Sequence, residues 1–355
     1  MNACAFYGTL KTYRPALYYA EPRPDKRGIF LEQIFTQIVS VIMSMVIALG
    51  TLAHSFFPQL SDAEDTNPSA VEDSQRGTTY SLDFTDYKPA DIQKILLESF
   101  ENFAPNMTFS FEDPLTKAET KDFEDAIADS LYTIIAEHPE IFWIANKSYY
   151  LSWYYVDEDY TSLTLSFTYC ETEASAKVRQ KEIDETVKKL LEKAPTDDTF
   201  RCLKYFHDIV ASSAVYDSET AADQSESYAG KEDAFNITGV FLNNSAVCEG
   251  YAKAFKYLCD QVYIPCTVVF GSAYDASHAW NYVTIEGKNY LVDTTWDDQD
   301  PTIYACFLKG KNGLVGKTPA SQIYKADSTV ENWSSKDYPM VSLLPKFRGE
   351  FIPNN

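Results

Sequence analysis

The sequence HAWNYVTIEGKNYLVDTTWDD, residues 278–298, decides the fold of the C-terminal part of this chain. Two runs of alternating apolar and polar residues flank the tight-turn signal EGK at 286–288, which is typical of a β-hairpin. We place Glu286 and Gly287 at the centre of the turn. The stretch therefore predicts two antiparallel strands whose pairing starts directly beside this turn.

The register of this hairpin brings two functional side chains to one face of the sheet. With Ile285 opposite Lys288, His278 faces Thr295, and Asp293 lies two residues along from Thr295. Side chains two residues apart on a strand share a face, and such diagonal neighbours are about 7–8 Å apart, within side-chain reach. The pattern therefore predicts that His278 and Asp293 lie side by side.

Upstream, SAVCEGYAKAF at 245–255 places Cys248 at the predicted start of a helix. Ser245 or Asn244 is expected to cap this helix, and an apolar stripe follows at Tyr251, Ala254, Phe255, Leu258 and Val262. The positive end of a helix favours thiolate over thiol, and its free N–H groups can stabilise an oxyanion. A cysteine at such a position is by itself more often a packing residue.

The order of these elements favours a catalytic interpretation. A predicted strand at 266–271 and a loop at 272–277 connect the cysteine helix to the hairpin. His278 alone would pass for a structural histidine, and Asp293 alone for a cap at a strand end. A nucleophile, a base and a residue that orients the base are together what Cys–His–Asp catalysis requires. Cys248, His278 and Asp293 are therefore the candidate catalytic residues.

Three motifs in this region, VCEGYAKAF, HAWNYV and YLVDTTWDD, resemble those of the transglutaminase-like superfamily in its bacterial extracellular branch. The resemblance covers about residues 199–310. It implies an α+β, papain-like fold in which the nucleophile helix packs on an antiparallel sheet. It also implies that Cys248 is the nucleophile, His278 the base and Asp293 the partner of the base.

The same resemblance suggests two further residues. Tyr216, in VYDSE at 215–219, is the candidate that assists the oxyanion, as an aromatic residue does in some relatives. Trp280 shares the face of His278 and is expected either to wall the cleft or to pack in the core. We find no acidic cluster that matches the calcium sites of animal transglutaminases, and bacterial members as a rule need no metal, so we expect no cofactor.

Composition excludes some functions. The formal net charge of −22 argues against nucleic acid as a partner, because a phosphate binder needs Lys and Arg to release counterions. The seven cysteines and four histidines have no zinc-site spacing. The odd number of cysteines leaves at least one thiol unpaired if all disulfides lie within the chain.

The N-terminal region contains an apolar run. No charged residue occurs from Ile34 to Phe57, and a helix of that length covers roughly 36 Å, enough to cross a bilayer. Basic residues precede the run and acidic residues follow it, so the positive-inside rule places the N-terminus in the cytoplasm. A signal peptide cleaved at 48–50 or 51–53 is the main alternative, and a buried core helix is the other. The bulk of the chain is thus expected to be membrane-anchored and extracellular, or secreted if the segment is cleaved.

These patterns predict a smaller α+β domain of unknown role before the catalytic domain. It contains predicted helices at 89–103, 118–142 and 174–194 and a hairpin whose aromatic residues at 149–155 either pack in a sheet or line a peptide or glycan groove. The predicted divisions are a basic cytoplasmic N-terminus (1–28), a transmembrane anchor or signal segment (29–57), a flexible acidic linker (58–79), the α+β domain (80–195), the transglutaminase-like domain (196–345) and a tail (346–355).

The predicted chemistry is attack of a thiolate on the amide carbonyl of a protein or peptide substrate, with cell-wall-associated substrates among the candidates. The attack gives a thioester, which water hydrolyses in a protease or amidase, or which a lysine amine attacks in protein crosslinking. A non-catalytic cell-surface binding module that retains the fold is the alternative. A further alternative is a disulfide-built adhesin, in which Cys248 pairs with Cys259 or Cys266.

Overall fold

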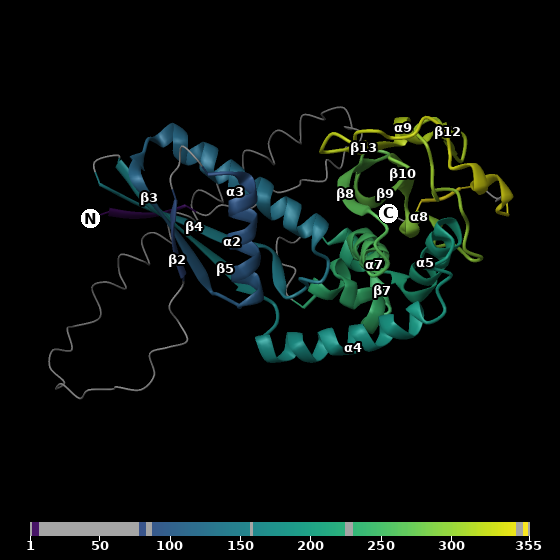
Figure 1. Ribbon diagram of the computed structural model, residues 1–355, viewed down its shortest axis with the longest axis horizontal. Helices are drawn as coiled ribbons and strands as arrows, with labels where there is room; N and C mark the ends of the chain where they lie inside the picture. The colour runs from purple at the N-terminus through teal and green to yellow at the C-terminus, as the bar shows by residue number, and fades with distance from the viewer. Residues whose placement is uncertain are drawn as a thin grey trace, which may run out of the picture. The chain divides into compact units, whose positions relative to one another are not determined.

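The computed structural model describes residues 2–6, 78–82, 87–156, 159–223, 230–345 and 351–353 (Figure 1). All of them belong to one compact unit. The predicted transmembrane or signal segment at 29–57 lies outside the described residues, as does the predicted linker up to residue 77. Within the described ranges, no helix is both long and apolar enough to cross a membrane.

The N-terminal part of the unit is built on a five-stranded sheet with the order β1-β4-β5-β3-β2. The predicted hairpin is confirmed, because β4 and β5 pair antiparallel along most of their length. β2 is parallel to β3, and the other pairs are antiparallel. The strands are β1 (Asn2–Phe6), β2 (Thr78–Leu82), β3 (Asn106–Leu115), β4 (Ile144–Val156) and β5 (Asp159–Tyr169).

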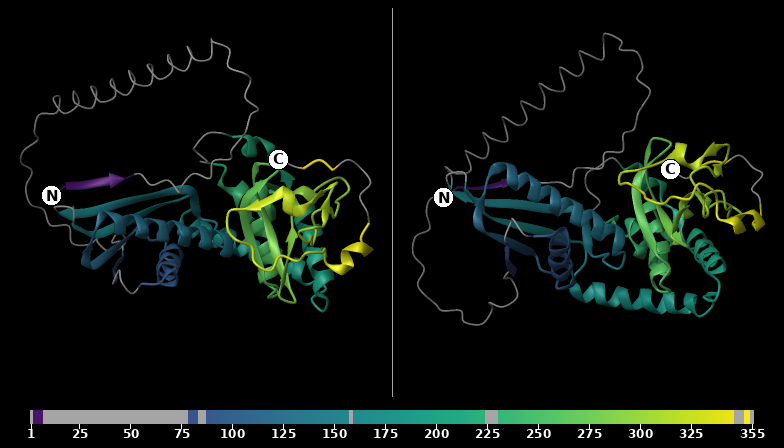
Figure 2. Two further views of the ribbon diagram at one scale, coloured as in Figure 1. Left: turned by 90° about the horizontal axis from the view of Figure 1, so that it is seen from above. Right: turned by 45° about the horizontal axis from the view of Figure 1, so that its top comes forward.

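Two helices cover one face of this sheet, α2 (Pro89–Glu101) and α3 (Lys117–Glu137), and Figure 2 shows both on the same side. Their apolar stripes, including Ile92 and Phe123, share a core with every second residue of β5, such as Leu163. The aromatic residues at 149–155 therefore divide by strand alternation. Tyr149 and Trp153 are buried in this core, whereas Tyr150 and Tyr154 are exposed.

β1 is paired along its whole length with β4 at the edge of the sheet. The predicted span at 29–57 would place residues 1–28 across a membrane from the rest of the chain. A span between residues 6 and 78 would separate β1 from the sheet that it joins, so a retained span and this pairing exclude each other in one molecule. The membrane segment at 29–57 stays a prediction.

The C-terminal part has the predicted arrangement of a helix on an antiparallel sheet. α7 (Cys248–Asp260) packs on β8 and β9 in a four-stranded sheet of order β10-β9-β8-β13 (Figure 1). On its other side α7 contacts α5 (Thr199–Ser213), which begins at the Asp198 cap. The strands of this sheet are β8 (Cys266–Ala273), β9 (Ala276–Ile285), β10 (Lys288–Val292) and β13 (Tyr324–Ala326).

Shorter elements complete this part. They are β6 (Val215–Tyr216), α6 (Ser218–Ala222), η1 (Glu232–Phe235), η2 (Gly239–Asn243), β7 (Ser245–Ala246), α8 (Thr294–Asp297), β11 (Leu314–Val315), β12 (Thr318–Pro319), α9 (Ala320–Ile323) and η3 (Pro339–Leu343).

Helix α4 (Glu173–Leu191) packs into the core of the C-terminal part. Its buried residues Ala176, Ile183 and Val187 belong to the same apolar cluster as residues of α5 and α7. This charged helix was predicted as the last element of the preceding 80–195 domain. Its narrow apolar stripe shows that one face is buried but does not show against which partner.

The hairpin of β9 and β10 has the predicted turn, with Lys288 paired to Ile285 and positive φ at Glu286 and Gly287. The pairing ends at Val292, however, so the predicted pair of His278 and Thr295 is wrong. The chain leaves the sheet at Asp293 because that side chain caps α8. The predicted loop at 272–277 is also shorter than expected, because β8 and β9 continue to a turn at 274–275.

Candidate active site

Cys248 is the first residue of α7 and is free and half-buried. The cap is Val247, which has no side-chain acceptor, rather than the predicted Ser245 or Asn244. Ser245 is instead part of β7, and Asn244 has a left-handed φ of 54° at the end of η2. With no side chain capping the helix, the positive end of α7 acts directly on the thiol at its first position.

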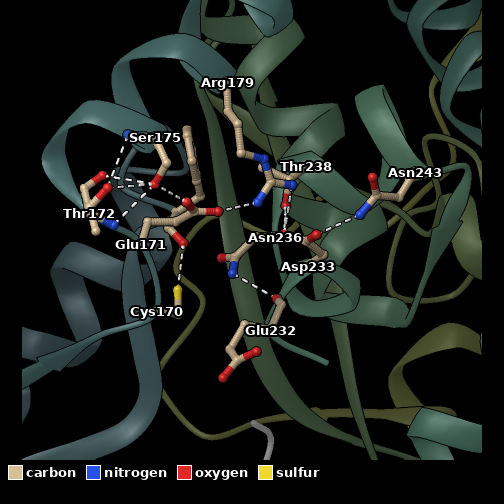
Figure 3. A network of polar contacts seen from close by, with 11 residues as sticks. Cys170, Glu171, Thr172, Ser175, Arg179, Glu232, Asp233, Asn236, Thr238 and Asn243 are labelled. Carbon is tan, nitrogen blue, oxygen red and sulfur yellow. Dashed lines mark hydrogen bonds and ion pairs between the residues drawn. The ribbon is translucent and has the colours of Figure 1, made fainter. Parts of the chain in front are cut away.

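A polar network holds the loop that precedes Cys248 (Figure 3). At its centre, the carboxylate of Asp233 accepts hydrogen bonds from Arg179 and Thr238, each over 2.8 Å, and from Asn243 over 2.5 Å. Arg179 lies on α4 and also forms an ion pair with Glu171. The network therefore ties α4 to the segment that leads into the nucleophile helix.

The loop lies directly against the first turn of α7. The N–H of Val247 donates to the carbonyl of Ala234 over 2.9 Å. A Cβ atom at Gly250 would lie only 2.5 Å from that same carbonyl oxygen. Gly250 is therefore needed for the close approach of loop and helix, which the sequence alone did not indicate.

His278 and Asp293 are in direct contact, as the sequence predicted, although the strand pairing on which that prediction was based ends at Val292, one residue before Asp293. Nε2 of His278 lies 2.8 Å from Oδ2 of Asp293, and the two side chains are 3% and 0% exposed. Burial by itself lowers the pKa of His278, but the charge and hydrogen bond of Asp293, and then the neighbouring Cys248 side chain, raise it to about 10. The ring is thus held in its charged form beside the thiol.

Asp293 is held by two more hydrogen bonds. Its Oδ1 accepts the N–H of Trp296 over 3.1 Å, and its Oδ2 accepts the hydroxyl of Tyr324 over 2.8 Å. Tyr324 was not among the predicted site residues, because no motif marks it and it lies after the region that carries the three motifs. Its position follows from the pairing of β13 with β8, which places Tyr324 opposite Ala273.

Aromatic rings enclose the imidazole of His278. The rings of Trp296 and Trp280 stack beside it, with centroids 4.9 Å and 6.1 Å away, and the ring of Tyr324 lies at 6.3 Å. Trp280 is only 1% exposed and packs edge-on against Tyr324. The geometry of Trp280 thus fits core packing rather than a wall of an open cleft.

Tyr216 lies next to the nucleophile segment, because β6 pairs with β7 and Tyr216 faces Ala246, two residues before Cys248. Burial, followed by the nearby Cys248, Asp293 and Asp217, raises the pKa of the phenol far above its usual value. Tyr216 therefore keeps its proton and can donate a hydrogen bond near the thiol. Its role with the oxyanion stays a prediction.

Cys248 is free, and so are the other cysteines whose side chains the structure describes, Cys170, Cys202, Cys259, Cys266 and Cys306. This contradicts the adhesin interpretation, in which Cys248 would pair with Cys259 or Cys266. In the part of the chain that the structure describes, no group of three or more His, Cys, Asp or Glu side chains could hold a metal ion. The arrangement offers a thiol, a charged imidazole and a buried carboxylate, a set suited to nucleophilic acyl transfer.

Residues 185–296 match the family model of the Transglutaminase-like superfamily, and this range contains Cys248, His278 and Asp293. Kyphoscoliosis peptidase from Homo sapiens is 29% identical over 129 residues, which cover 32% of this chain and 18% of that protein. The Mus musculus protein of the same name is 30% identical over 95 residues, covering 23% and 13%. The chain thus spans less than a fifth of the length of these curated relatives.

A crystal structure of a TGase is similar over 54% of this chain and 50% of its own, with 15% identity and a TM-score of 0.30, a likeness too weak to bear on function. The two curated relatives are from Homo sapiens and Mus musculus, and the bacterial extracellular branch stays a prediction.

Proposed function

Because residues 185–296 form a domain of the transglutaminase-like superfamily, we propose that this protein is a cysteine-dependent acyl-transfer enzyme that attacks amide carbonyls in a protein or peptide. The observation that carries the proposal is the buried contact of 2.8 Å between His278 and Asp293. This pair lies beside a free thiol at the start of a helix, and Cys248 raises the pKa of His278. Together these are the parts that thiol catalysis needs.

The first half of the reaction forms a thioester. The thiolate of Cys248 attacks the carbonyl carbon, and the tetrahedral oxyanion is stabilised by N–H groups at the start of α7. The hydroxyl of Tyr216 is the proposed second donor. The His278 imidazolium then gives its proton to the amine, which leaves as the C–N bond breaks. Asp293 keeps the ring oriented and stabilises its charge.

The second half of the reaction releases the acyl group. Neutral His278 takes a proton from water or from an amine as this nucleophile attacks the thioester carbonyl. The C–S bond then breaks, Cys248 leaves as a thiolate, and His278 keeps the proton, which restores the thiolate–imidazolium pair. Water gives a carboxylic acid, whereas an amine gives a new amide. We favour hydrolysis, because water is far more abundant than any amine, and the name of the human relative, a peptidase, agrees with this choice.

We also propose that the enzyme acts outside the cytoplasm. The support is the uncharged run from Ile34 to Phe57 with its basic N-terminal flank. The pairing of β1 with β4 speaks against both routes, because a retained span would separate β1 from the sheet and cleavage at 48–50 or 51–53 would remove β1. N-terminal sequencing of the protein purified from its native host checks the point, since a cleaved signal segment yields a chain that starts close to residue 51 or 54.

The activity is tested by incubating the protein with a glutamine-rich protein and a tagged amine, beside the Cys248→Ala variant. Shortening of the substrate or release of ammonia without tag incorporation, lost in the variant, is the expected result. Incorporation of the tag would assign a transglutaminase instead. If the folded protein gives neither result, the enzymatic proposal is refuted and a binding module that retains the fold is favoured.

A further inference from the structure

A second histidine–carboxylate pair lies in the core and has no part in the proposed reaction. Nε2 of His207 is 3.1 Å from Oδ2 of Asp297, and both side chains are 0% exposed. Burying such a pair is costly, and removing one partner leaves the other without compensation. The segments that the His207–Asp297 pair connects therefore depend on both partners.

Asp297 is the last residue of α8, the short helix that Asp293 caps. The N–H of Asp297 donates to the carbonyl of Asp293 over 3.2 Å. Cys306 connects the two acids as well, because its N–H donates to Asp297 over 2.9 Å and its carbonyl accepts the N–H of Asp293 over 3.1 Å. The carboxylate of Asp297 and the backbone of Asp293 thus belong to one hydrogen-bonded frame.

His207 attaches this frame to helix α5. Its Nδ1 lies 3.2 Å from Oδ1 of Asp208, so both ring nitrogens face carboxylate oxygens. The rings of Tyr304 and Phe307 pack against the imidazole, with centroids 5.2 Å and 4.9 Å away. Burial lowers the pKa of His207, but Asp208 and Asp297 outweigh it and raise the pKa above its usual value. The imidazole therefore lies between α5 and α8, and the two carboxylates favour its charged form.

We propose that His207 is a positioning residue, which through Asp297 and α8 holds Asp293 in the place where it contacts and orients His278. This role rests on the proposed function of the Cys248, His278 and Asp293 site. His207 touches none of the reacting groups.

The physical reason is the separation of only four residues between the two acids. Burial raises the pKa of Asp297 to about 6, and the charge of Asp293 also raises it, whereas His207 acts in the opposite direction. Without the imidazolium, Asp297 takes up a proton or turns away. Either change alters the frame that fixes Asp293, so the contact of Asp293 with His278 weakens.

Histidine NMR titration tests the role without any substrate. The chain has four histidines, so the imidazole signals can be assigned with single variants. In His207→Leu we expect the titration midpoint of His278 to fall by about one pH unit or more, a loss of about 1.4 kcal/mol in favour of the charged ring. His207→Gln keeps a donor toward Asp297 and should give a smaller fall, and Asp297→Asn should resemble His207→Leu.

The matched control is His138→Gln. His138 also pairs with a carboxylate, Nδ1 lying 2.9 Å from Oε1 of Glu140, but it is partly exposed and remote in sequence from α8. The His138→Gln substitution should leave the titration midpoint of His278 unchanged. Circular dichroism reports whether each variant folds, and if His207→Leu does not fold, His207→Gln and Asp297→Asn decide the question.

Folded variants of His207 or Asp297 with an unaltered His278 midpoint would overturn the positioning role alone, while the proposed function stands. The positioning role would also be overturned if these variants lost acyl transfer while the titration midpoint of His278 stayed the same, because His207 would then have a merely structural role. A wild-type midpoint near the ordinary histidine value would also overturn the positioning role, because His278 would then lack the charge-stabilising contact that the role needs, whereas the proposed function is decided by the assay with the Cys248→Ala variant.

Discussion

The hydroxyl of Tyr324 donates a hydrogen bond of 2.8 Å to Oδ2 of Asp293, the same oxygen that contacts His278. Tyr324 is 3% exposed and lies on β13, a strand of the same sheet that follows the β9–β10 hairpin in the chain. A buried carboxylate needs such partners, because an ion without them is costly in the protein interior. Tyr324 thus completes the surroundings of Asp293 from a segment that follows the matched family region.

Tyr324→Phe removes this bond and leaves the ring packing. We expect kcat of acyl transfer to fall by about tenfold and the free energy of unfolding to fall by about 1–3 kcal/mol, because a charged acceptor loses a donor. Steady-state kinetics and urea unfolding give the two values. The control is Tyr290→Phe, a buried tyrosine of β10 that packs on Tyr338 and should change kcat little. Equal kinetics for both variants would contradict the role given to Tyr324.

The pH dependence of stability follows from the raised pKa of His278. The folded-state value of about 10 lies above the usual 6.5, so the stabilisation is complete below about pH 6.5 and is lost as the pH rises to about 10. The difference in unfolding free energy between wild type and His278→Gln should therefore shrink from pH 6.5 to pH 10. Denaturant unfolding of both proteins at three pH values measures it, and a constant or growing difference would disprove the contact.

Arg179→Met should loosen the loop that leads to Cys248. The substitution removes both ion pairs of Arg179, with Asp233 and with Glu171. Because the Arg179 side chain is only 21% exposed, we expect the free energy of unfolding to fall by about 1–2 kcal/mol. Lys177→Met is the control on the same helix. Its pair with Glu173 is largely exposed and should contribute no more than about 0.5 kcal/mol. Urea unfolding compares the two, and equal losses would refute the prediction.

Gly250→Ala should destabilise the protein, although alanine normally stabilises a helix relative to glycine. The new Cβ would lie 2.5 Å from the carbonyl oxygen of Ala234, so the loop must move away from the helix. Overpacking of this kind costs about 1–3 kcal/mol. Thermal and urea unfolding provide the measurement, and a gain in stability would show that the loop yields without cost.

Tyr216→Phe tests the proposed oxyanion donor. Loss of one donor typically lowers kcat by about 10²–10³-fold, and KM and the free energy of unfolding should change little. Steady-state kinetics with the substrate found in the amine-incorporation assay measure the effect. A kcat close to that of the wild type would assign Tyr216 to packing against Tyr251, whose ring centroid lies 6.5 Å away.

Local patterns were sufficient for much of the fold. The helices α2, α3, α4, α5 and α7, both hairpins and the turn at Glu286 and Gly287 follow from periodicity and turn chemistry. Local patterns failed to predict the structure where one side chain can form either of two local hydrogen bonds. Asp293 could continue a strand or cap a helix, and its bond to the N–H of Trp296 decided for the cap. The cap of α7 was missed for a related reason, because Asn244 and Ser245 are engaged in η2 and β7.

The sequence by itself determined that a cysteine starts a helix and that a histidine of the following hairpin lies close to an aspartate at the end of that hairpin, because strand alternation and turn geometry act over a few residues. Only the tertiary structure decided what surrounds them. His207 and Asp297 are 90 residues apart, and Tyr324 meets Asp293 from 31 residues downstream. Contacts between such distant segments depend on how whole elements pack, and no local periodicity encodes that packing.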